Sequence, residues 1–100
     1  METIIQKQDA NMVAILKGRL DTAAAPDTEK AMGELINGTE KEIILDCTEL
    51  EYISSAGLRI FLTILQNTQE KGGHVYIKGI SDDVRAVFAL TGFINIFEFI

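Results

Sequence analysis

The sequence has almost none of the residues that form disulfides and zinc sites. Its 100 residues include one cysteine, Cys47, one histidine, His74, and no tryptophan. A single cysteine cannot form an internal disulfide, and one cysteine with one histidine is too few for a Cys/His zinc site. We therefore expect Cys47 to be a small buried apolar side chain rather than a reactive thiol, and we predict no cofactor.

Basic residues and long apolar runs are also scarce. Nine Lys and Arg residues stand against fifteen Asp and Glu residues, which gives a net charge of −6. That balance argues against nucleic acid as a partner, because phosphate binding depends on clustered cations, and it favours a protein partner. No apolar run approaches the roughly 18 residues of a membrane-spanning helix, and the amino-terminal residues do not resemble a signal peptide. We expect a cytoplasmic protein that contacts no membrane.

What the chain does contain is an alternation of strand and helix patterns that fits one domain over residues 1–100. Strand patterns fall at residues 3–8, 11–20, 41–46, 75–78 and 94–100, and helical patterns at about residues 25–37, 55–71 and 82–91. A turn-like segment at residues 9–11 predicts an antiparallel hairpin, and the one proline, Pro26, fits a first helical turn. The order β-β-α-β-α-β-α-β predicts an α/β fold.

The strand expected at residues 41–46 reads as the centre of the sheet. It contains the uninterrupted apolar run Ile43-Ile44-Leu45, which is typical of a parallel strand covered on both faces. We expect this strand to end at Asp46. That carboxylate would then lie at the carboxyl edge of the sheet, where open α/β sheets place their sites.

Two adjacent serines, Ser54 and Ser55, precede an apolar pattern at positions 58, 61, 62 and 65, which has the spacing of one helix face. A helix therefore begins at the serines. Its unpaired first-turn amides and the positive end of its dipole would lie beside a hydroxyl, which suits a phosphate. The simpler interpretation is that a serine only caps the helix.

Residues 45–58, LDCTELEYISSAGL, resemble the central signature of STAS domains, the family of bacterial anti-sigma-factor antagonists. In that family a strand and a short loop lead to a serine-rich segment that opens a helix, and the phosphorylated serine stands two residues before a glycine. The corresponding residue here is Ser55, before Gly57. Ser54 replaces the aspartate that is common in the family, and this second hydroxyl makes Ser54 the second choice.

Residues 18–21 are similar to the Gly-Glu-Leu-Asp segment of STAS domains, in which the aspartate lies close to the phosphorylation loop. The resemblance therefore implies that Asp21 contributes to the site. The alternative is that Asp21 is a turn or capping carboxylate for the next helix. Arg59 stands where the family frequently has glycine.

The resemblance implies a single STAS domain, a mixed sheet with helices mainly on one face, and a protein that is not an enzyme. It also implies partner switching: the unmodified protein binds an anti-sigma factor that is a serine kinase, phosphorylation of Ser55 ends the complex, and a serine phosphatase restores it. The residues expected to contact the partner are Asp21, Asp46, Ser54, Ser55, Ala56, Gly57 and Arg59.

Two other functions stay open on the sequence. The chain can be a STAS-like scaffold or regulatory subunit in which Ser55 only caps a helix, or a small nucleotide-binding domain, although it lacks a glycine-rich phosphate loop. His74 is expected at the opposite end of the sheet from the serines, which leaves them without a catalytic base. The family usually continues into a final helix beyond the segment that ends here at Ile100, so we expect some exposed apolar surface there.

Overall fold

The computed structural model describes residues 1–9 and 11–100 as one five-stranded sheet with helices on it. The strands are β1 (Glu2–Gln8), β2 (Asn11–Leu20), β3 (Glu42–Ile53), β4 (His74–Lys78) and β5 (Glu98–Phe99). The helices are α1 (Ala25–Ala31), α2 (Gly33–Asn37), α3 (Ser55–Glu70), α4 (Asp82–Leu90) and the 3₁₀ helix η1 (Phe93–Asn95).

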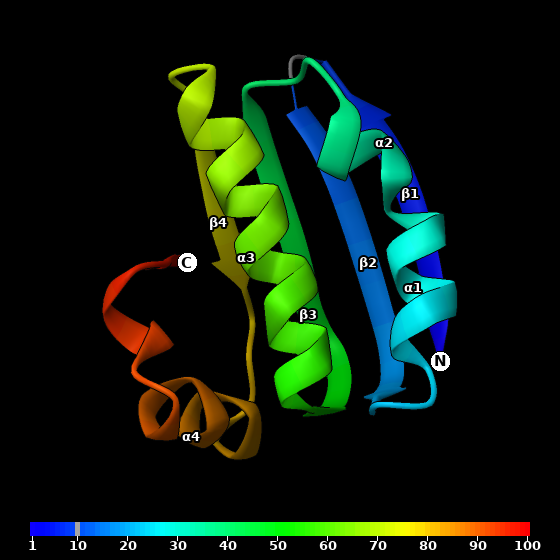
Figure 1. Ribbon diagram of the computed structural model, residues 1–100, viewed down its shortest axis with the longest axis vertical. Helices are drawn as coiled ribbons and strands as arrows, with labels where there is room; N and C mark the ends of the chain where they lie inside the picture. Colours follow the sequence, from blue (N-terminus) through cyan, green and yellow to red (C-terminus); the bar gives the residue numbers. More distant parts are fainter. Residues whose placement is uncertain (10) are drawn as a thin grey trace.

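The sheet is mixed. Its strand order is β1-β2-β3-β4-β5, with β1 antiparallel to β2 and every other neighbouring pair parallel. Figure 1 shows α1, α2 and α3 lying across one face, with α4 beyond the end of β4. This confirms the predicted α/β fold. The predicted hairpin turn includes Ala10, which lies outside the described residues, but β1 and β2 pair antiparallel as far as Gln8 and Asn11.

The core lies between the sheet and α3. Alternate residues of β2, β3 and β4 point to the helices, as the period of two along a strand requires, and α3 contributes the apolar face that its sequence spacing predicts. The buried residues of this layer are Met12, Ala14, Leu16, Ile43, Leu45, Val75, Ile77, Leu58, Phe61, Ile64 and Leu65. Cys47 is also fully buried and free, as expected.

The expectation that β3 is covered on both faces is wrong. Ile43 and Leu45 are buried against the helices, whereas Ile44 points to the open face and is half-buried. Ile44 lies between Val13 of β2 and Tyr76 of β4 in the strand register. Lateral apolar neighbours therefore shield Ile44 without a second layer of helices, and the sequence of the strand alone does not distinguish the two cases.

The predicted end of β3 at Asp46 is also wrong, because the strand continues to Ile53. Residues 47–53 include polar residues and were expected to form a loop, but β2 is long enough to pair with them. Register shifts between residues 15 and 17 and between residues 18 and 19 of β2 keep Leu50 and Ile53 buried. Asp46 consequently lies within the strand, seven residues before its end, or about 23 Å at the usual rise per residue.

Two further boundaries differ from the prediction. The first helical segment is two short helices, α1 and α2, which meet at the fully buried Met32 and at Gly33, a poor helix former. The last segment is not a strand over residues 94–100. Gly92 adopts a left-handed φ of 79° after α4, η1 follows it, and β5 has only two residues.

Apolar side chains are exposed near the carboxyl terminus, as expected. Leu90 is 87% exposed, Ile96 44% and Ile100 63%. Within the described residues, no helix combines the length and apolar character needed to cross a membrane.

Candidate functional site

The candidate site lies where β2 and β3 end side by side. Leu20 pairs with Ile53 in the parallel register, and the Ser54 amide donates a hydrogen bond of 2.8 Å to the Leu20 carbonyl. From this edge, one strand leads through Asp21 into α1 and the other leads directly into α3. The sheet therefore places Asp21 and the two serines at the same carboxyl edge, as predicted. His74 begins β4 at the opposite edge.

Ser54 is the N-cap of α3. Its backbone is extended, at φ −91° and ψ 171°, and its hydroxyl oxygen accepts a hydrogen bond of 3.2 Å from the Gly57 amide. The residue is only 8% exposed. The Ser54 hydroxyl is therefore occupied and shielded, which makes it a poor acceptor for a phosphoryl group delivered from outside.

Ser55 is the first residue of α3 and is exposed. Within the described residues its hydroxyl takes part in no side-chain hydrogen bond, and the first turn of α3 contains no acidic residue. The positive end of the helix dipole at this turn is thus not balanced by a carboxylate on the helix itself. The arrangement leaves a free hydroxyl at a position that tolerates an anion.

Gly57 lets α3 approach the two strand ends closely. A Cβ at this position would lie 2.7 Å from Cγ of Leu20 and 2.9 Å from Cγ1 of Ile53, closer than real contacts allow. The glycine of the motif is therefore required by packing between the helix and the sheet. Because Gly57 is fixed against both strands, the serines that precede it are held at the edge.

Asp21 acts locally as a turn carboxylate. Its Oδ1 accepts a hydrogen bond of 2.9 Å from the Ala24 amide, and the Ala25 amide bonds to its carbonyl at 3.1 Å. The alternative interpretation of Asp21 is thus confirmed. Since Asp21 also lies beside the β3 end, the same turn that it stabilises forms one wall of the candidate site.

Asp46 does not lie at this edge, contrary to the prediction. Its Oδ1 accepts hydrogen bonds from the amide and hydroxyl of Thr48, at 3.1 and 2.7 Å. Partial burial acts to raise the pKa of the carboxyl, but these two bonds and the nearby Lys78 ammonium outweigh it and lower the pKa below its ordinary value. Asp46 therefore makes a local contact with Thr48 within β3.

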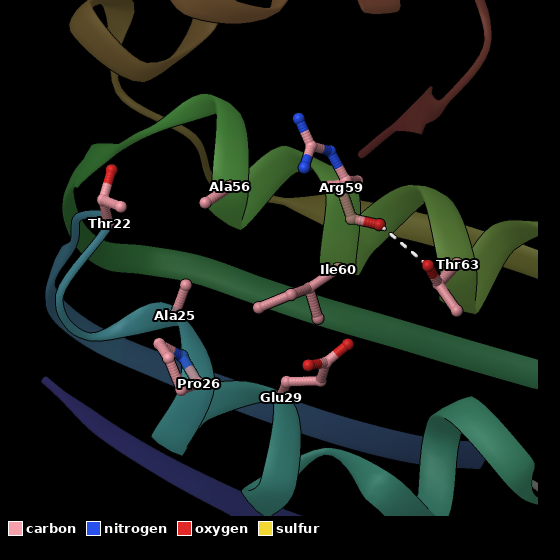
Figure 2. A pocket seen from close by; sticks show the side chains of 8 residues that line it. All are labelled: Thr22, Ala25, Pro26, Glu29, Ala56, Arg59, Ile60 and Thr63. Carbon is pink, nitrogen blue, oxygen red and sulfur yellow. Dashed lines mark hydrogen bonds between the residues drawn. The ribbon is translucent and has the colours of Figure 1, made fainter.

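A groove of about 390 Å³ separates α1 from α3 next to the serines. Figure 2 shows residues of α1 and α3 facing one another across it. Its lining residues are Thr22, Ala25, Pro26, Glu29, Ala56, Arg59, Ile60 and Thr63. The groove exists because the facing positions Ala25 and Ala56 are small. Of the residues predicted to contact a partner, it brings together Ala56 and Arg59.

A family model described as the STAS domain matches residues 2–100. The chain belongs to the STAS domain family. The resemblance seen in residues 45–58 is thus confirmed and extends along almost the whole sequence.

Relatives of this STAS domain are named as regulators. The chain is 32% identical over 97 residues to a Bordetella bronchiseptica protein named as the anti-sigma factor antagonist BtrV, which covers 97% of this chain and 84% of that protein. An anti-sigma factor antagonist from Mycobacterium paratuberculosis has a TM-score of 0.87 at 22% identity, over 98% of this chain and 83% of that one. These names describe regulatory proteins rather than enzymes.

The anti-sigma factor antagonist SpoIIAA shares the fold in two chemical states. Its unphosphorylated form has a TM-score of 0.82 at 21% identity, over 99% of this chain and 88% of that one. The phosphorylated form of the Bacillus protein has a TM-score of 0.74 at 19% identity, over 99% and 91%. At these identities the comparison shows the fold alone.

Sequence reasoning missed several residues at the edge of the STAS domain. Arg19 and Tyr52 are paired in the strand register and exposed, and the Arg19 guanidinium lies 4.5 Å from the centre of the Tyr52 ring. Glu29 and Thr63 line the groove. The sequence does show that Ala25 and Glu29, and likewise Arg59 and Thr63, are four residues apart and so share a helix face. That spacing does not predict which two helices face each other.

Proposed function

We propose that this STAS domain is an anti-sigma-factor antagonist that works by partner switching in the cytoplasm. Unmodified, it binds an anti-sigma factor that is also a serine kinase and displaces the sigma factor from it. The kinase phosphorylates Ser55 and thereby ends the complex, and a serine phosphatase restores the unmodified form. The names of the relatives support the antagonist role, and the two forms of SpoIIAA support a phosphorylated state of the fold.

The observation that carries the proposal is the contrast between the two serines. Ser54 is buried and its hydroxyl caps the helix, whereas Ser55 is exposed and its hydroxyl has no such role. In the transfer, the Ser55 hydroxyl oxygen forms a bond to the γ-phosphorus of ATP while the bond to the bridging oxygen of ADP breaks. The hydroxyl proton passes to a base of the kinase.

The phosphate would act on the complex and leave the fold intact. An anion at a helix N-terminus gains about 0.3–1 kcal/mol, so the modification does not unfold α3. A change from 99% bound to 1% bound requires about 5.5 kcal/mol of difference in affinity. A phosphate of roughly −1.5 to −2 charge, placed in an interface with too few cations, supplies that difference through repulsion and desolvation.

Intact mass spectrometry after incubation with the anti-sigma kinase and ATP tests the proposal. We expect a gain of about 80 Da, the mass of one phosphoryl group, in the wild type and none in Ser55→Ala. Ser81→Ala is the control, because it removes another exposed serine at the start of a helix, and it should keep the full gain. No gain in the wild type, or an equal gain in Ser55→Ala, would contradict the proposal.

A further inference from the structure

The groove next to Ser55 carries one charge of each sign on its two walls. Arg59 stands on the α3 wall and Glu29 on the α1 wall, and both are exposed. Between them the floor is apolar and contains Ala25 and Ile60. Figure 2 shows the Arg59 guanidinium extending away from the Glu29 carboxylate, and the ion pairs recorded among the described residues include neither group.

Arg59 lies one helical turn after Ser55. Residues four apart on a helix share a face, with about 5–6 Å between their Cβ atoms, and their side chains tilt toward the N-terminus. The Arg59 side chain is therefore within reach of a group attached to Ser55. A guanidinium binds carboxylate and phosphate with the same paired N–H geometry, so Arg59 is suited to either.

We propose that Arg59 is shared between the two states of the switch. In the unmodified protein it binds a carboxylate of the anti-sigma factor, whose docking segment lies in the groove between α1 and α3. When Ser55 is phosphorylated, the Arg59 guanidinium turns to the phosphate. The carboxylate of the partner then loses its counter-ion and is also repelled by the phosphate. This inference rests on the proposed function and adds the chemistry of the partner segment.

Charge complementarity decides what the segment must carry. Arg59 is the one cationic residue among the eight that line the groove, in a protein of net charge −6. A purely acidic segment would be repelled by Glu29 and by that net charge. The segment that fits has an apolar side chain for the floor, a carboxylate for Arg59 and a cation for Glu29.

The first experiment needs no partner. Phosphoserine is incorporated at position 55 of the full chain, and its second pKa is followed by ³¹P NMR in the Arg59 parent and in Arg59→Gln. Pairing with the guanidinium favours the dianion, so we expect the phosphate pKa to be lower in the parent by about 0.2 to 0.4 units. Arg85→Gln, which removes an exposed arginine on α4, should leave the phosphate pKa unchanged. An equal pKa in the parent and in Arg59→Gln would overturn the proposal.

The second experiment is a double-mutant cycle on binding to the purified anti-sigma factor of the phosphotransfer assay. We expect Arg59→Ala to weaken binding of the unmodified protein about tenfold, and Ser55→Glu to weaken binding less in the Arg59→Ala background than in the wild type. Arg59→Lys should recover part of the lost affinity. If Ser55→Glu has the same effect in both backgrounds, the role of Arg59 is refuted while the switch stands. If Ser55→Glu has no effect even in the wild type, the switch itself fails.

Discussion

Helices α3 and α4 begin with the same cap and differ in the charge and size of the residues in the turn that follows it. Ser54 and Ser81 both have extended backbones, and each hydroxyl accepts a hydrogen bond of 3.2 Å from the amide three residues later. A serine cap is therefore no evidence of a functional site. What distinguishes α3 has to be found in its next three residues and in its surroundings.

The first turns of the two helices differ in charge: that of α4 is acidic and that of α3 has no acidic residue. After its cap α4 has Asp82 and Asp83, which place two carboxylates at the positive end of the helix, whereas α3 has Ser55 and Ala56 and no acidic residue. Phosphorylation of Ser55 would give α3 the anion that α4 carries permanently at Asp82. The helix start that we propose to be phosphorylated is thus the one whose first turn has no acidic residue.

The third position of each helix tests this comparison with the largest expected effect. Gly57 is packed against Leu20 and Ile53 with no room for a Cβ, so Gly57→Ala should destabilise the domain by about 1–3 kcal/mol through overpacking. Most of that range exceeds the gain of about 1 kcal/mol in helix propensity, so we expect a net loss of stability. Val84, the equivalent residue of α4, is buried, and Val84→Ala should cost about 2 kcal/mol by leaving a cavity.

Urea unfolding separates the two mechanisms. Leu20→Ala makes room beside position 57, so its effect should be smaller in the Gly57→Ala background than in the wild type. In the Val84→Ala background, Leu20→Ala should keep its full effect. Strict additivity with Gly57→Ala would show that crowding against Leu20 is not the reason for the glycine.

The two caps themselves should differ by a smaller amount. Ser54→Ala leaves the Gly57 amide unpaired in a buried place, where water cannot replace the hydroxyl, and we expect a loss of about 2 kcal/mol. Ser81→Ala frees an amide near exposed residues, and we expect about 1 kcal/mol. Urea midpoints measure both values, and equal losses would mean that burial of the cap contributes nothing.

The sequence predicted the parts of this comparison that depend on neighbours along the chain. A serine cap at the start of α3 and the helical turn at Pro26 follow from local chemistry, and the structure has both. The resemblance of residues 45–58 to STAS domains identified the fold. It also drew attention to Ser55, whose role is still a proposal.

The parts that failed depend on contacts between distant segments. β3 continues past Asp46 because β2 pairs with it through register shifts. The residues of β3 alone do not predict that pairing. The groove beside Ser55 depends on which helix packs against α3, so Glu29 was not predicted. Asp46 was assigned to the site only because the strand was expected to end there.

The smallest effect tests the comparison most directly, because it exchanges the charges of the two helix starts. Ser55→Asp gives α3 a carboxylate in its first turn and should stabilise the domain by about 0.3–1 kcal/mol. Asp82→Ser removes one from α4 and should destabilise it by a similar amount, reduced if Asp83 keeps part of the interaction.

Both differences should shrink toward zero in 1 M salt, where the Debye length falls to about 3 Å. Thermal unfolding of the two variants at low and high salt measures them. If Ser55→Asp destabilised the fold at low salt, phosphorylation would act by loosening α3. The proposal that phosphorylation ends the complex and leaves the fold intact would then be wrong.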